Sequence, residues 1–179
     1  MAVRRVVTGR TATGTSVIVS DDSVEAISVA LAPNSQWHNI WGVDEIQTLP
    51  HDGAAPAVSE YFPPVDGFRF GFFSVAPQAT SQLPADLDLL AALDEFESKL
   101  PGLARHMEPA DPGMHASHTV DCGVVLSGEV VLELDDGQSV SLGAGDTFVQ
   151  NATRHRWSNV TNVPAVIAVA MIGARHRDS

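Results

Sequence analysis

Six short apolar segments follow one another between residues 119 and 173 with no helical pattern among them, and this succession limits the possible folds most strongly. Val130, Leu132 and Leu134 fall on one side of their segment, the period of two that a strand with one buried face produces. Turn-forming residues separate the segments, in "DDG" at 135–137, "GAGD" at 143–146 and "NVTNVP" at 159–164. Together they predict an all-β sandwich or barrel.

The N-terminal region, residues 1–80, is also divided into short extended segments and is expected to form strands and an arm. Residues 50–67 are rich in Pro, Gly and Ala without periodicity and are interpreted as a loop. The next segment, 68–77, alternates as a strand does. Trp37, Trp41 and the "YFPP" at 61–64 are expected to pack the arm across the barrel or against a second copy, rather than to bind a ligand.

One amphipathic helix is predicted around residues 85–100, within a helical insertion at 83–106. Its expected apolar stripe is core packing and consists of Leu87, Leu90, Leu93, Phe96 and Leu100. Because no linker divides the sequence, a single domain over residues 1–179 is predicted.

The net charge of −12 disfavours nucleic acid and anionic membrane surfaces as partners, since both are polyanions. A run of about 18 apolar residues, which could span a bilayer, does not occur. The first 20 residues lack the apolar core of a signal peptide, so a cytoplasmic location is expected. The single cysteine, Cys122, is expected to be a small buried hydrophobic residue.

The stretch from Val124 to Asn159 resembles the cupin superfamily. Its two half-motifs are His-x-His, Glu and Gly, and then Gly-Asp, His and Asn. The glycine of the first is Gly128, and the second is matched by Gly145, Asp146, His155 and Asn159. The resemblance implies a double-stranded β-helix, or jelly-roll barrel, with its core at 113–173, a small-molecule pocket, a homodimer and one divalent transition metal.

The same resemblance carries the metal ligands over one at a time. His115 falls on the first histidine, Asp121 on the glutamate and His155 on the last histidine. Ser117 replaces the second histidine, which is the main departure from the family pattern. His155 also comes one residue early, and Asn151 stands where a proline is usual.

Strand parity gives an independent expectation for these residues. Alternate residues of a strand face the same side, so His115, Ser117 and Asp121 should all face into the barrel and His118 should face out. A β-bulge would be needed to make His118 a fourth ligand; otherwise it lies at the pocket rim. Trp157 shares a side with His155 and is expected to form the pocket wall.

Two histidines and one carboxylate are a set that binds Fe(II), and zinc, manganese or nickel would also accept it. One hypothesis is therefore a small metal-dependent enzyme acting on a small organic acid or oxygenated metabolite, by oxygenase, decarboxylase or isomerase/lyase chemistry. The alternative is a non-catalytic, metal-free cupin that binds a small molecule, with Ser117 marking the loss of metal. A phosphate-binding loop and a nucleophile elbow are both missing from the sequence.

Overall fold

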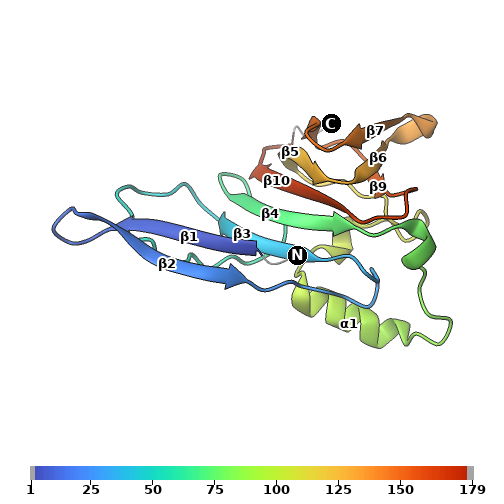
Figure 1. Cartoon of the computed structure of the whole chain (residues 1–179), viewed down its shortest axis with the longest axis horizontal. Coiled ribbons are helices and arrows are strands. Elements are labelled where there is room, and N and C mark those ends of the chain that lie inside the picture. Colours follow the sequence, from blue (N-terminus) through green and yellow to red (C-terminus); the bar gives the residue numbers. More distant parts are fainter. Residues whose placement is uncertain (1–2, 177–179) are drawn as a thin grey trace.

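The computed structural model describes residues 3–176 and is built mainly from antiparallel strands (Figure 1). A five-stranded sheet has the order β3-β4-β10-β5-β8, and a three-stranded sheet has the order β7-β6-β9. The strands of the first are β3 (Trp37–Val43), β4 (Phe68–Val75), β10 (Ala165–Gly173), β5 (Thr119–Ser127) and β8 (Thr147–Asn151). Those of the second are β7 (Ser139–Gly143), β6 (Glu129–Glu133) and β9 (Arg156–Ser158). The all-β prediction is confirmed.

The inner faces of the two sheets supply the core. On β5, Asp121 and Val125 are buried, whereas Cys122 is exposed on the opposite face. The expectation of a buried Cys122 was therefore wrong, because strand parity places its side chain on the outside of the sheet. On β6, Val130 and Leu132 are buried, as the alternation predicted.

Isolated bridges continue the smaller sheet beyond β9. His115 pairs with His155 on one side and with Met107 on the other. The segment that carries His115 thus becomes an additional short strand next to β9, which positions the first predicted ligand beside the last one.

Helix α1 (Leu89–Lys99) confirms the predicted helix, although it begins at a later residue. Asp88 is its N-cap and accepts hydrogen bonds from the backbone N–H groups of Leu90 and Ala91, which would otherwise lack partners. The buried face consists of Ala92 and Phe96. Leu90 is 77% exposed and Leu93 47%, so the predicted stripe was wrong at these positions: the helix rests on the barrel along a narrower face.

The N-terminal arm is a hairpin of β1 (Val3–Arg10) and β2 (Ser16–Val24), which projects from the body of the molecule (Figure 1). Residues 50–67 form the expected irregular segment. The buried Arg69 fixes the C-terminal part of this irregular segment, because it donates hydrogen bonds to the backbone oxygens of Val43 and Glu60. None of the helices among residues 3–176 is long and apolar enough to cross a membrane.

The turn between β5 and β6 requires a glycine. Gly128 has a φ of +74°, and an added Cβ would approach the Cα of Ala165 to 2.7 Å. Gly137 has a similar φ of +73° but has no atom within 4 Å of the same position. A comparison of alanine substitutions at these two positions therefore separates the cost of the left-handed backbone conformation from the cost of a steric clash.

We expect Gly137→Ala to lower the free energy of unfolding by about 1 kcal/mol, the cost of the left-handed conformation. Gly128→Ala should lower the free energy of unfolding by about 2–4 kcal/mol, because the clash with Ala165 adds to the cost of the left-handed conformation. Urea denaturation of both variants measures the difference. Equal losses would show that the close contact with Ala165 does not constrain this turn.

Candidate functional site

The two predicted histidine ligands lie side by side. The backbone N–H of each donates to the backbone oxygen of the other, with N···O distances of 3.0 Å and 2.9 Å. Their ring centroids are 4.2 Å apart, and the ring planes are inclined by 49°. Phe62 packs near the ring of His115, with the two centroids 6.4 Å apart. A residue pair separated by 40 positions is thus fixed by one antiparallel bridge.

Backbone carbonyls fix the tautomer of both rings. Nδ1 of His115 lies 3.0 Å from the oxygen of Gly113, and Nδ1 of His155 lies 2.8 Å from that of Thr153. A carbonyl only accepts, so each Nδ1 carries the proton and each Nε2 presents a lone pair. Burial lowers the pKa of His115, and burial together with the charge of the neighbouring His115 lowers that of His155 to about 4. Both imidazoles are therefore neutral at pH 7, the form that binds metal.

Ion pairs hold the chain around this histidine pair. Arg154 donates to the carboxylates of Glu108 and Asp111, and Arg156 donates to those of Asp111 and Glu133. The two arginines flank His155, so the segment before His115 is tied to the strand that carries His155.

Asp121 lies in a buried polar row on the inner face of the larger sheet. Its neighbours across the strands are Met171 and Gln150. Thr119 donates a hydrogen bond to its carboxylate, and the buried Ser117 hydroxyl lies 2.6 Å from that of Thr119. Oδ1 of Asp121 and Nε2 of Gln150 are both buried without a partner. Burial raises the pKa of Asp121 to about 6, because a charged carboxylate is costly there.

The histidine pair fits a metal ion better than the complete predicted set does. With metal–nitrogen bonds of about 2.0–2.1 Å, two imidazoles can share one ion only when their rings are close together, as these are. Within residues 3–176, however, His, Cys, Asp and Glu side chains do not form any group of three that could hold a metal. Asp121 is thus buried on the inner face, as parity predicted, but is not brought to the histidines.

The remaining predicted site residues lie apart from this pair. Ser117 is buried, and its hydroxyl is engaged by Thr119. His118 faces out and stacks on His176, with ring centroids 4.7 Å apart. Trp157 lies 6.1 Å from the ring of His155 and 4.8 Å from that of Phe148, and it packs against the core.

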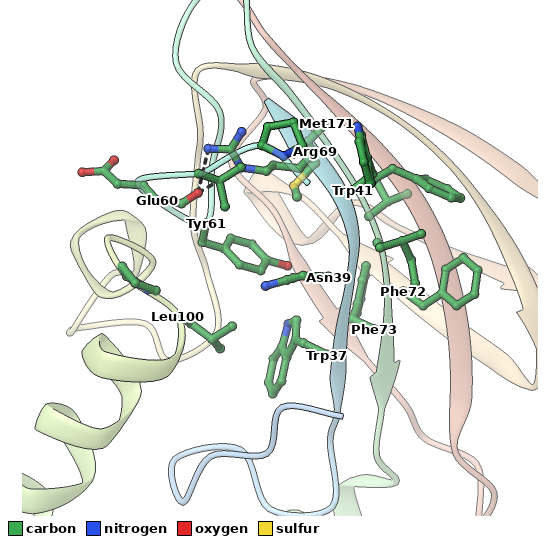
Figure 2. Close-up of a pocket in the computed structure, with 18 of the residues that line it drawn as sticks. Trp37, Asn39, Trp41, Glu60, Tyr61, Arg69, Phe72, Phe73, Leu100 and Met171 are labelled. Carbon is green, nitrogen blue, oxygen red and sulfur yellow. Dashed lines mark hydrogen bonds between the residues drawn. The ribbon is translucent and has the colours of Figure 1, made fainter. Parts of the chain in front are cut away.

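A cavity of about 180 Å³ opens along β3 and beneath the loop at 55–61 (Figure 2). Trp37, Asn39, Tyr61 and Phe73 are among the residues that line it, and Figure 2 shows the Tyr61 side chain directed toward Asn39. The Trp37 indole hydrogen-bonds to the buried Tyr61 hydroxyl. Burial and the charge of Asp121 raise the Tyr61 pKa, which places Asp121 near this tyrosine.

Sequence reasoning had assigned Trp37, Trp41 and Tyr61 to packing and missed that all three line a cavity. The clustering of aromatic residues in two segments was the available signal. It was not sufficient, because the cavity forms only when β3 and the 55–61 loop come together. His115, His155 and Trp157 are not part of its lining.

Comparison with known proteins agrees with this architecture. Residues 105–171 match the family model of the cupin domain. Phomopsin biosynthesis cluster protein C' of Diaporthe leptostromiformis is 36% identical over 94 residues, covering 45% of this chain and 50% of that protein. The cupin-domain-containing oxidoreductase srdD of Neurospora crassa is 32% identical over 93 residues, covering 46% and 47%.

The chain therefore spans about half the length of these curated relatives. Among solved structures, the cupin domain of Schizosaccharomyces pombe Cnp3 aligns with a TM-score of 0.49 and 8% identity, over 95% of this chain and 87% of that one.

The raised pKa of Asp121 predicts a pH-dependent stability. The pKa of Asp121 rises from its ordinary value of 3.8 to about 6 in the folded protein, so the folded protein holds this proton more tightly than the unfolded chain does. The free energy of unfolding therefore falls as the pH rises through that range and Asp121 ionises. Relative to the wild type, Asp121→Asn should gain up to about 3 kcal/mol of unfolding free energy between about pH 4 and pH 7, in chelator.

Urea titrations across this range measure the difference, and Asp94→Asn on the exposed side of α1 is the matched control. The contribution of His155 is common to all three proteins and cancels. A difference between Asp121→Asn and the wild type that does not change with pH would contradict a buried, unpaired carboxylate.

Proposed function

We propose that this protein is a metal-dependent cupin enzyme that acts on a small organic acid or oxygenated metabolite. The observation that carries the proposal is the pair of neutral imidazoles of the half-buried His115 and the buried His155, each fixed at Nδ1 by a backbone carbonyl. Second hydrogen bonds of this kind orient metal-ligating histidines and fix their tautomer. With Nδ1 engaged in this way, Nε2 is the ring nitrogen of each histidine that is available to a metal.

Asp121 becomes the third ligand in this proposal if metal binding brings its carboxylate to the histidine pair, from which it is separate in the metal-free fold. Its buried Oδ1 has no partner, and a cation would stabilise the ionised carboxylate that burial now disfavours. Fe, Zn, Mn and Ni are all compatible with two imidazoles and one carboxylate. Such an ion, when bound, acts as a Lewis acid with open coordination positions. The chain's own residues orient the ligands and, through Phe62 and Trp157, surround them with apolar side chains.

The names of two relatives support an enzymatic role of the oxidoreductase class. The matched proteins of Neurospora crassa and of Aspergillus ruber are both named cupin-domain-containing oxidoreductases. Others are named after biosynthesis clusters, which favours a small metabolite as the substrate.

We also propose a homodimer that forms through the outer face of the five-stranded sheet. One cross-strand row on this face consists of Phe70, Ala170, Cys122 and Val149, and carries no charge. In a chain of net charge −12, an uncharged apolar face is where two copies can meet without repulsion. Val149, which is 61% exposed, offers the test: Val149→Asp should give a monomer in sedimentation analysis.

The second candidate function is metal-free binding of a small molecule. Two observations favour it: the described residues contain no three-ligand group, and the Ser117 hydroxyl is already engaged by Thr119. In that case the cavity along β3 is the binding site and the histidine pair is structural.

Metal analysis separates the two functions. Protein purified without chelator should hold roughly one transition metal per chain, and His155→Ala should weaken metal binding by at least about 100-fold. His118→Ala is the matched control, because this exposed ring stacks on His176 and should leave metal content unchanged. A metal-free wild type that cannot be reconstituted would contradict the first function and support the second.

A further inference from the structure

Arg5 on β1 has an unsatisfied guanidinium edge. Its Nη1 donates to the backbone oxygen of Ile40 at 3.2 Å, whereas its Nε is buried without any hydrogen-bond partner. A buried, unpaired donor on a charged group is costly, so a native protein seldom keeps one without a function or a bound partner. Nε and the adjacent Nη2 form the side of the guanidinium that binds a carboxylate through two parallel hydrogen bonds.

The other arginines with described ion pairs show how unusual this is. Five of them contact carboxylates, namely Arg4, Arg69, Arg105, Arg154 and Arg156. Arg4, the neighbour of Arg5 on the strand, binds Asp21 through Nε and Nη2, each 2.6 Å from a carboxylate oxygen. Among residues 3–176, an ion pair of this kind is not found for Arg5, although Asp22 is its cross-strand neighbour.

Arg5 lines the cavity of about 180 Å³. Glu60, the carboxylate in the cavity lining, is already paired with Arg105, and Arg69 of the lining is paired with Asp44. Arg69 itself donates to Asp44 and to backbone oxygens, so it is not available for a ligand. Arg5 is therefore the cation of the cavity lining that is left to meet an anion.

The walls of the cavity determine the rest of the ligand. Trp37, Tyr61 and Phe73 provide aromatic faces, and Asn39 provides an amide on an exposed side chain. An apolar cavity of about 150 Å³ can hold one benzene ring, so this volume fits one ring with a short polar substituent. Planar apolar groups stack favourably on such aromatic walls.

We propose that the cavity binds a small carboxylate with a planar apolar body, held at its carboxylate by the Nε–Nη2 edge of Arg5. The inference goes beyond the proposed function, because it assigns a ligand class to a cavity whose lining contains neither His115 nor His155. Binding itself requires no metal, since the ligand contacts lie on β1, β3 and β4 and not at His115 and His155.

Titration of the full chain with benzoate, followed by ligand-observed NMR in chelator, tests the proposal. Wild type should bind benzoate and discriminate against benzamide, which has the same shape without the charge, by at least about tenfold. Arg5→Gln should weaken benzoate binding by at least about tenfold, and Arg5→Lys by less, because lysine keeps the charge but loses the fork. Arg4→Gln, on the same strand, should leave the affinity unchanged.

Asp22→Asn tests whether the Asp22 carboxylate pairs with Arg5 in solution. If Asp22 competed for Arg5 in solution, its removal would tighten benzoate binding; an Arg5 side chain held at Ile40 predicts no change. Far-UV circular dichroism and thermal melts confirm that each variant is folded.

Three results would overturn the proposal: no benzoate binding by wild type up to about 10 mM, equal binding of benzoate and benzamide, or unchanged binding by Arg5→Gln. A fourth would be a change of oligomeric state in Arg5→Gln with benzoate affinity intact, since the carboxylate would then come from a second copy. Because the titration is run in chelator, a protein that never binds metal contradicts the proposed enzyme without affecting this result.

Discussion

The antiparallel bridge between His115 and His155 is the interaction on which the candidate site depends. Its two backbone hydrogen bonds extend the smaller sheet to a segment that contains no named strand. Because the bridge fixes the backbone, each ring can use a nearby carbonyl to hold its Nδ1, and both Nε2 atoms remain available. The ion pairs of Arg154 and Arg156 attach the preceding acidic segment to the same strand and so support this geometry from outside.

Among residues 3–176, buried polar groups without partners mark two places where the fold is not optimised for stability alone. Asp121 and Gln150 form one such place on the inner face of the larger sheet. Arg5 forms the other, at the cavity along β3. Each unsatisfied group reduces stability, and a bound cation or anion would relieve it. For Asp121 and Arg5 the sign of the charge indicates the relieving ligand, a cation for the carboxylate and an anion for the guanidinium.

Local periodicity predicted much of the fold but little of the cavity. Strand parity correctly placed Asp121 and Ser117 inside and His118 outside, because alternation depends only on neighbouring residues. It did not reveal that α1 buries Ala92 in place of Leu90 and Leu93, since the docking angle of a helix is set by its tertiary partners. Nor could it show that Arg5 meets Ile40, 35 positions away. The His115–His155 pair was inferred from family resemblance, and the separation of Asp121 from that pair requires the three-dimensional structure.

X-ray absorption spectroscopy of the zinc-loaded protein shows whether the histidine pair binds a metal ion. If His115 and His155 share one ion, the spectrum contains two imidazole nitrogens at about 2.0–2.1 Å, with oxygen atoms as the remaining ligands. The imidazole signal should weaken in His115→Ala and in His155→Ala alike. A first coordination shell that consists only of oxygen, or a protein that retains no zinc after dialysis, would contradict metal binding by the histidine pair.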